Sequence, residues 1–167
     1  MKLAYLGLGS NLGDREEALR EALKKLEGPG VRLLRVSSVY ETEPIGFSNQ
    51  GWFLNLCAEV ETTLFPKQLL QRTQRLEREM GRRRTVKDGP RIIDIDILLY
   101  GNAVVHTADL KIPHPLYGER RFVLAPLAEL KPTLRDPETG KSVTEMLGNV
   151  QAQKIRLAGP LNPCRTN

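Results

Sequence analysis

A period-two alternation over residues 93–99 is the feature that most limits how this chain can fold. Isoleucine or leucine stands at positions 93, 95, 97 and 99 on one face of a β-strand, while Asp94 and Asp96 share the other face. On such a strand the Cα atoms of the two aspartates lie about 6.5–7 Å apart. On a half-buried sheet they repel each other and lose hydration, so they need a cation between them. Oxygen ligands alone favour a hard ion such as Mg²⁺, which completes its shell with phosphate oxygens and water.

A dense cationic segment over residues 81–87 precedes this strand. Its arginines are candidate phosphate ligands because a guanidinium group binds two phosphate oxygens at once. Carboxylates for a metal beside arginines for phosphate indicate phosphoryl-type chemistry on a nucleotide. A solvated Asp-x-Asp face beside an ordinary basic surface loop fits the same residues, and spacing alone does not exclude it. The candidate phosphate ligands are Arg82, Arg84 and Arg91.

Length and composition describe one ordinary globular domain. The chain has 167 residues, of which 40% are hydrophobic and 27% charged, and its formal net charge of +5 favours small anionic ligands. Aromatic residues make up only 5%, so the stacking surfaces of a single-strand nucleic-acid binder are scarce. No apolar run approaches the roughly 20 residues that span a bilayer. Cys57 and Cys164 have neither metal-ligand spacing nor the pattern of a disulfide framework, so we expect a cytoplasmic protein. The composition as a whole leads us to expect no membrane, nucleic-acid or obligate protein partner.

The order of predicted elements is that of an α+β protein. Apolar periodicities and turn residues predict strands over 3–8, 31–40, 53–62 and 93–99, and helices over 15–26 and 66–80. The resulting β-α-β-β-α-β order is the ferredoxin-like arrangement, with one sheet and both helices on one of its faces. Phe53 and Asn55 would then share the other face with the two aspartates. The predicted additions are a short strand around 104–105, helices over 121–130 and 142–147, and a tail over 151–167 without a motif.

Further residues have the chemistry to meet a nucleotide or a flat ring. Gln74 and Glu77 lie on one side of the second helix, although a plain surface pair has the same spacing. His114 stands between two prolines that fix its direction, and its imidazole could donate to a phosphate; a structural histidine is the alternative. Phe53 and Phe122 could stack on a heterocycle that Asn55 hydrogen-bonds, or the two rings could belong to the core.

These pieces together resemble one family, 6-hydroxymethyl-7,8-dihydropterin pyrophosphokinase of folate biosynthesis. The most specific match is the segment 87–98, Lys-Asp-Gly-Pro-Arg-Ile-Ile-Asp-Ile-Asp-Ile-Leu, which agrees with the family signature at every defining position. The other segments that carry the resemblance are 9–13, 40–46, 53–55, 73–77, 112–114 and 120–126. The resemblance covers about 3–148 of an expected single domain over 1–167 and leaves a tail of unknown role at 149–167.

The resemblance implies an activity and its ligands. A member of this family transfers the terminal pyrophosphoryl group of ATP to the hydroxymethyl oxygen of the pterin and releases AMP. Asp94 and Asp96 would hold two Mg²⁺ ions, which can neutralise charge on both the attacking and the leaving oxygen of an in-line displacement. ATP and 6-hydroxymethyl-7,8-dihydropterin are therefore the expected small-molecule partners.

The resemblance also implies roles for individual residues, carried over by position. Those implied for catalysis are Arg82, Arg84, Arg91, Asp94 and Asp96, with Arg84 in a loop that closes over the substrates. Those implied for ATP are Gln74, Glu77, Arg82, Arg91, His114 and Arg120. Those implied for the pterin are Thr42, Pro44, Ile45, Phe53, Asn55, Asp94 and Phe122.

Two departures from the family pattern affect these expectations. Phe53 stands where some members have tyrosine, so stacking survives without a phenol hydrogen bond. The loop between Arg84 and Gly89 is short and lacks the Arg-Trp pair of some members, which puts the family's mode of loop closure in doubt here.

Two other functions fit parts of the pattern. A nucleic-acid-binding ferredoxin-like module would explain the net charge, but it displays aromatic residues on the open sheet face, where this chain has two carboxylates. A metal-dependent phosphohydrolase could use the same aspartates, but such a site usually recruits additional histidine and acidic ligands. Formation of AMP that requires the pterin distinguishes transfer from hydrolysis.

Overall fold

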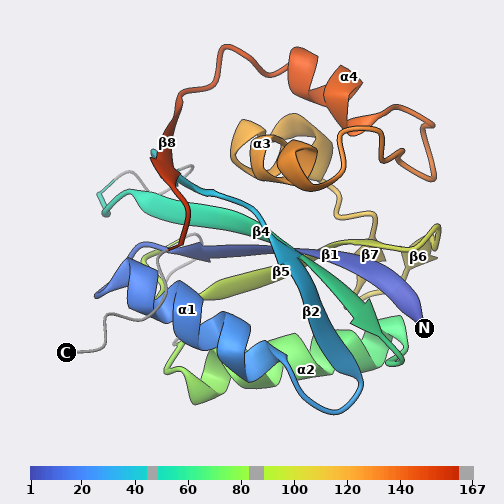
Figure 1. Cartoon of the computed structure of the whole chain (residues 1–167), viewed down its shortest axis with the longest axis horizontal. Helices are drawn as coiled ribbons and strands as arrows, with labels where there is room; N and C mark the ends of the chain where they lie inside the picture. Colours follow the sequence, from blue (N-terminus) through green and yellow to red (C-terminus); the bar gives the residue numbers. More distant parts are fainter. Residues whose placement is uncertain (45–48, 83–88, 162–167) are drawn as a thin grey trace.

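An antiparallel sheet of six strands forms the centre of the protein (Figure 1). The computed structural model describes residues 1–44, 49–82 and 89–161. The strands run in the order β5-β1-β4-β3-β8, and β2 also pairs with β4. Their bounds are β1 Lys2–Ser10, β2 Val31–Val36, β3 Val39–Thr42, β4 Phe53–Thr62, β5 Asp94–Tyr100 and β8 Ile155–Gly159. Two short strands, β6 (Val105–His106) and β7 (Lys111–Ile112), pair with each other beside it.

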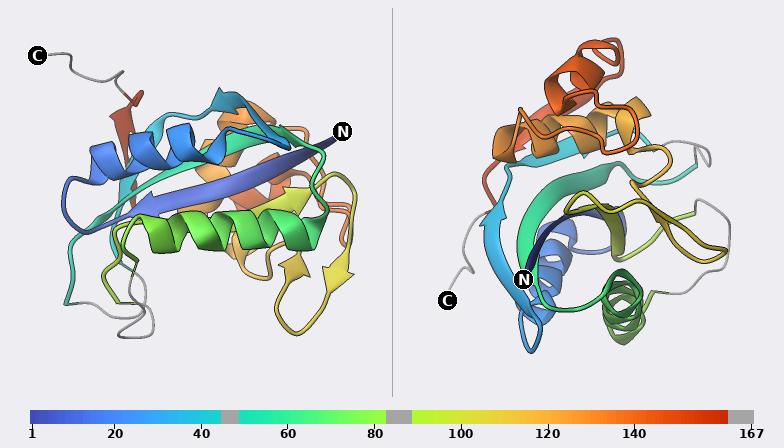
Figure 2. Two further views of the ribbon diagram at one scale, coloured as in Figure 1. Left: turned by 90° about the horizontal axis from the view of Figure 1, so that it is seen from below. Right: turned by 90° about the vertical axis from the view of Figure 1, so that its right-hand side faces the viewer.

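Two helices, α1 (Arg15–Leu26) and α2 (Pro66–Glu79), cover one face of this sheet (Figure 2). Helix α1 begins after Asp14, whose side chain accepts a 3.0 Å hydrogen bond from the backbone N–H of Glu17 and so satisfies one free donor of the first turn. The fully buried Leu19 packs in the main core, together with the alternate residues of β4 that face α1 and α2. These β4 residues are Leu54, Leu56, Ala58 and Val60, as the alternation predicts.

Two later helices, α3 (Arg121–Leu130) and α4 (Val143–Gly148), cover part of the opposite face. They bury Leu124, Leu127 and Met146 in a second core against Tyr5 and Cys57 of the sheet. The predicted helices on one face are therefore α1 and α2 only, and the C-terminal additions form another layer across the sheet. The part of this face that α3 and α4 leave open lies around the start of β4 and β5.

Two local predictions need correction. The predicted strand over 31–40 is divided into β2 and β3, because the buried Ser37 leaves the regular ladder and its hydroxyl accepts a 2.8 Å bond from the Cys57 N–H. The tail also contains a strand, β8, which pairs with β3 at the edge of the sheet. The predicted helices over 15–26, 66–80, 121–130 and 142–147 are confirmed to within a residue at each end.

Among the residues that the structure describes, no helix is long and apolar enough to cross a membrane.

Truncation of Leu19 tests the packing of α1 on the sheet. Leu19→Ala removes a fully buried side chain and should lower the free energy of unfolding by about 3 kcal/mol, through lost burial and a residual cavity. Leu3→Ala is the control, because Leu3 is 44% exposed and its truncation should change stability by no more than about 0.5 kcal/mol. Urea unfolding of both variants measures the difference. Equal effects would contradict the placement of α1.

Candidate active site

A cavity of about 150 Å³ lies on the sheet face beside the start of α3. Strands β1, β3, β4 and β5 line it, and the first turn of α3 closes one side. It brings together eight of the residues that the sequence predicts for the site: Thr42, Phe53, Asn55, Arg91, Asp94, Asp96, Arg120 and Phe122. The prediction that Phe53 and Asn55 share a face with the two aspartates is therefore confirmed.

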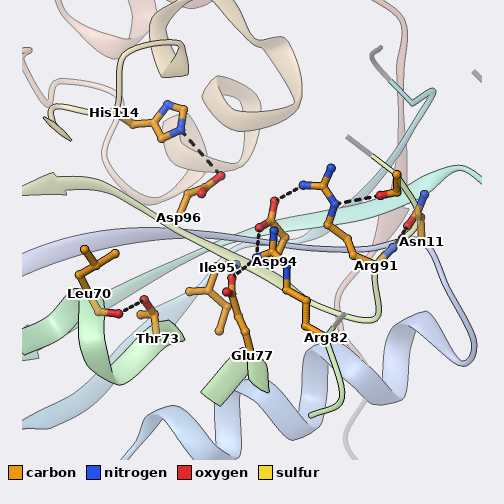
Figure 3. A network of polar contacts seen from close by, with 11 residues as sticks. Asn11, Leu70, Thr73, Glu77, Arg82, Arg91, Asp94, Ile95, Asp96 and His114 are labelled. Atoms are coloured by element: carbon orange, nitrogen blue, oxygen red, sulfur yellow. Dashed lines mark hydrogen bonds and ion pairs between the residues drawn. The ribbon is translucent and has the colours of Figure 1, made fainter. Parts of the chain in front are cut away.

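Asp94 lies between two arginines that hold its two oxygens (Figure 3). Arg82 Nη1 is 2.7 Å from Asp94 Oδ1, and Arg91 Nη1 is 2.8 Å from Asp94 Oδ2. All three side chains are mostly buried, which strengthens these charge-assisted bonds relative to a surface pair. The arginines predicted to bind phosphate are thus already oriented toward the carboxylate predicted to bind metal.

Glu77 supports this arrangement from the helix below the sheet. Its carboxylate is 2.6 Å from Arg82 Nη1 and accepts a 2.7 Å hydrogen bond from the backbone N–H of Ile95 in β5. Glu77 is 4% exposed, and burial raises its pKa, although the Ile95 N–H and the Arg82 charge oppose that shift. Glu77 therefore ties α2 to the strand that carries both aspartates. In these contacts it acts as a support for Arg82 and β5.

Asp96 faces the same cavity, and among the described residues it has no cationic partner as close as those of Asp94. Burial, followed by the negative charges of Asp94 and Glu77, raises the pKa of Asp96 to about 7. Two neighbouring carboxylates that repel each other favour the binding of a cation. The donor set is oxygen only, which fits a hard divalent ion such as Mg²⁺. The described residues contain no group of three or more His, Cys, Asp and Glu side chains that could hold a metal.

His114 approaches Asp96 from the loop after β7. Its Nε2 is 3.9 Å from Asp96 Oδ2, and its Nδ1 accepts a 3.2 Å hydrogen bond from the backbone N–H of Leu116. That acceptor role places the proton of the neutral ring on Nε2, facing the carboxylate. Burial and the charge of Arg120 lower the pKa of His114, so the ring is neutral at pH 7.

Another part of the cavity lining has the features of a site for a flat polar ring. Asn55 is buried, and its Nδ2 donates a 2.8 Å hydrogen bond to Thr42 Oγ1, which sets the direction of the amide. Gly9 lies directly across from Asn55 in the sheet, and a Cβ atom there would come within 2.7 Å of Asn55 Oδ1. Glycine at position 9 therefore leaves the space that this amide needs.

Each phenylalanine of the cavity lies beside an arginine. The guanidinium of Arg91 is 5.6 Å from the centre of the Phe53 ring, and that of Arg120 is 5.7 Å from the centre of the Phe122 ring. These contacts join the ring-binding part of the cavity to its cationic part.

Asn11 is a positioning residue that is absent from the predicted set. Its Oδ1 accepts a 2.8 Å hydrogen bond from the Arg91 N–H, while its Nδ2 donates to Gln50 Oε1 and to the Gly51 carbonyl. It therefore joins the turn after β1 to the segment before β4 and to Arg91. Its place in a glycine-rich turn is the one signal in the sequence, and such a turn by itself indicates only a connection between strand and helix.

The remaining predicted residues are placed less centrally or lie outside the described part of the chain. Gln74 is half-buried on α2 and Pro44 follows β3, and neither belongs to the described lining of the cavity. Ile45 and Arg84 fall in segments outside the described residues.

Comparison with known proteins identifies the family. The sequence model described as "7,8-dihydro-6-hydroxymethylpterin-pyrophosphokinase (HPPK)" matches residues 5–132. The chain belongs to this family. It is 50% identical to the 2-amino-4-hydroxy-6-hydroxymethyldihydropteridine pyrophosphokinase of Bacillus subtilis over 129 residues, which is 77% of each chain. It is 44% identical to the protein of the same name from Aquifex aeolicus, over 87% of this chain and 90% of that one.

The fold also matches solved structures. Plasmodium falciparum HPPK-DHPS superimposes with a TM-score of 0.73 at 15% identity, over 90% of this chain. This chain spans 45% of the length of that protein, so the match concerns the fold of one part of it. A mixed α/β architecture with an antiparallel sheet is thus shared with the family.

Replacement of each aspartate by asparagine should change stability in opposite directions. The raised pKa of Asp96 means that the unfolded chain ionises this group at lower pH than the folded chain. Stability is therefore lost as pH rises from 3.8 to about 7, and the loss persists above that window. Asp96→Asn removes the free-energy cost of keeping this carboxylate ionised in the folded protein, so it should raise the melting temperature at pH 8. We expect a rise of only about 2–4 °C, because partial exposure of the side chain screens its charge.

Asp94→Asn is the matched comparison, because it leaves Arg82 and Arg91 without their shared carboxylate. It should lower the free energy of unfolding by about 1–3 kcal/mol. Thermal unfolding with EDTA at pH 4 and pH 8 measures both variants. A lower melting temperature for Asp96→Asn at pH 8 would refute this description of the site.

Proposed function

We propose that this cavity binds ATP and 6-hydroxymethyl-7,8-dihydropterin together and carries out the reaction of the family. That reaction transfers pyrophosphate from ATP to hydroxymethyldihydropterin in folate biosynthesis. The observation that carries the proposal is the shared lining: two carboxylates, Arg91 and Arg120 line the same cavity as Asn55 and two phenylalanines. Donor phosphates and acceptor ring would then lie next to each other, which is the arrangement a direct transfer requires.

Asp94 and Asp96 are the proposed ligands of two Mg²⁺ ions. The ions would neutralise charge on the triphosphate and on the attacking and leaving oxygens. The raised pKa of Asp96 supports this assignment, because a bound cation would remove the repulsion that raises it. The binding of a divalent cation near pH 7 would accordingly release a proton from Asp96.

Arg82 and Arg91 are the proposed ligands of the phosphates. Each arginine binds one oxygen of Asp94, and the oxygens of an incoming triphosphate would offer both arginines further anionic acceptors. Arg120 faces them as a further cation, and the neutral His114 supplies a donor at Nε2 rather than a charge. Gln74, Glu77 and Arg84 keep their predicted roles toward ATP and loop closure as part of this proposal, although the contacts of Glu77 support a positioning role for it.

The acceptor is proposed to bind between Phe53 and Phe122. Stacking on two rings recognises the flat face of the pterin, while the oriented amide of Asn55 recognises its hydrogen-bonding edge. Thr42 orients that amide, and Pro44 and Ile45 are proposed to line the same end. None of the eight predicted residues in the cavity is placed to act as an obvious general base. Positioning and charge neutralisation are therefore the proposed sources of rate enhancement.

We also interpret the strand order as a ferredoxin-like sheet whose second strand is divided into β2 and β3. The single domain over 1–167 and the cytoplasmic location remain predictions.

Removal of either aspartate tests the reaction and the metal site together. Wild-type protein with ATP, pterin and Mg²⁺ should form AMP, and AMP should not form without the pterin or with EDTA. Asp94→Ala and Asp96→Ala should each lower kcat by at least roughly 100-fold, the scale of losing electrostatic stabilisation of a transition state. Glu138→Ala, an exposed carboxylate outside the cavity, is the control. AMP formation without pterin would instead favour a phosphohydrolase, and near-wild-type rates in both aspartate variants would exclude the metal assignment.

A methyl group at position 9 tests the pterin end alone. In Gly9→Ala the new Cβ forces Asn55 Oδ1 to move, so the hydrogen bond from this amide to the pterin should be lost. KM for the pterin should then rise roughly tenfold, which corresponds to the binding free energy of about one hydrogen bond. KM for ATP should stay unchanged. Gly148→Ala is the control, because a Cβ there meets nothing within 4 Å. Steady-state kinetics with each substrate varied separately measures the effect, and an equal rise in both KM values would argue against the placement of the pterin.

A further inference from the structure

The C-terminal segment Gln151–Gly159, called the strap below, lies beyond the part of the chain that matches the family model. It passes from the start of α3 to the edge of the sheet and ends as β8 (Figure 1). Its contacts fall at two places, one on each side of the cavity described above.

The first place is the first turn of α3. Arg121 Nη1 donates hydrogen bonds to the backbone carbonyls of Gln151 at 3.0 Å and Gln153 at 2.8 Å. The Arg121 N–H donates to Gln153 Oε1 at 2.8 Å, and Gln153 Nε2 donates to the Glu119 carbonyl at 2.7 Å. Four hydrogen bonds thus hold the beginning of the strap against the helix.

The second place is the end of β3. Strand β8 pairs with β3 so that Ile155 lies opposite Thr42 and Arg156 opposite Glu41. Arg156 also forms a side-chain ion pair with Glu41, which lowers the pKa of that carboxyl. Arg15 of α1 binds the other oxygen of Glu41 at 3.1 Å. The end of β3 is therefore held both by the strap and by α1.

The chain neighbours of these contacts line the cavity. Arg121 lies between Arg120 and Phe122 on one wall, and Glu41 precedes Thr42 on the other. Thr42 is the residue that accepts from the Asn55 amide. The residues that the strap contacts, Arg121 and Glu41, are thus each one position in the chain from a side chain proposed to bind substrate.

We propose that the strap fixes the width of the acceptor end of the cavity, with Arg121 and Arg156 as positioning residues for pterin binding. This inference rests on the proposed function of the same cavity. Arg156 follows Gln153 by three positions, and three residue steps span at most about 10–11 Å. With both ends held, the first turn of α3 cannot move away from Thr42 beyond that limit. Loss of the Arg121 contacts or of the Arg156–Glu41 ion pair would loosen one end, although the backbone pairing of β8 with β3 remains. The first turn of α3 could then move relative to Thr42, which would raise the cost of ordering the pterin in the cavity.

At the other end of α3, a separate contact explains why the effect should be local. Glu129 accepts a 2.9 Å hydrogen bond from the Ser38 N–H and another from the Tyr40 hydroxyl. Helix α3 is thereby held to the start of β3 without the strap. The free motion after release is a small opening of its N-terminal turn, and the second core stays packed.

The test compares Arg121→Ala, Arg156→Ala, the double variant and Arg135→Ala. Arg135 is the matched control, because it is 68% exposed against 70% for Arg156 and donates to the Gly140 carbonyl away from the cavity. Each single variant should raise KM for the pterin roughly fivefold to tenfold while kcat and KM for ATP stay within about twofold. Arg121→Lys keeps one cationic donor and should recover part of the loss.

The double variant identifies the mechanism. If the strap acts as one connection, releasing its second end adds nothing, so the double variant should match the weaker-binding single variant rather than the product of the two effects. Multiplicative effects, unchanged KM for the pterin, or a parallel loss of kcat would each overturn the proposal. Should Arg121→Ala fail to fold, Arg156→Ala with its exposed side chain decides the question. Absence of pterin-dependent AMP formation by wild-type protein would instead show that the proposed function is wrong.

Discussion

The ion pairs of Asp94 with Arg82 and Arg91 are the interaction on which the geometry of the site depends. Arg82 follows α2, Asp94 begins β5, and Arg91 is held by Asn11 in the turn after β1. One carboxylate thereby connects a helix, an edge strand and a turn that are distant in sequence. Glu77 completes the connection by binding both Arg82 and the backbone of β5. Because each guanidinium uses only part of its donor set here, both remain able to bind further oxygens.

The same region shows why a site for a highly charged substrate is costly to the free protein. Arginines that are proposed to bind phosphate need counter-charges in the free protein, and Asp94 and Glu77 supply them. Asp96 adds a carboxylate that has no comparable cation among the described residues, and its burial and the neighbouring negative charges raise its pKa. Substrate and metal would restore the balance, so the arrangement is complementary to the bound state rather than to the empty one.

Period-two alternation in the sequence predicts the part of the cavity that the sheet provides, whereas Thr42 and Arg120 are implied only by the family resemblance. It assigns the buried face of β4 and that of β5 as far as Ile97, and it therefore predicts that Asn55 lies on the same face as Asp94 and Asp96. Its extension to Leu99 is wrong, because the register of β5 on β1 shifts after Ile97 and Leu99 packs in the second core. It does not identify the support for that face. Glu77 has the spacing of an ordinary surface residue on α2, and only the packing of α2 under β5 explains its burial. The division at Ser37 depends likewise on a bond to Cys57, 20 residues away.

Strand β8 is not predicted from the sequence for a related reason, and it pairs with β3, whose Thr42 lines the cavity. Ile155–Gly159 has one charged residue, Arg156, two exposed apolar residues, Leu157 and Ala158, and no strong alternation. What stabilises it is β3, whose Glu41 lies 115 residues earlier in the chain. The edge of the sheet, the wall of the cavity and the C-terminal segment therefore depend on one another. A short edge strand is stable only when it pairs with the rest of the sheet. The residues of the C-terminal segment that contact β3 and α3 therefore matter more to the site than the length of that segment.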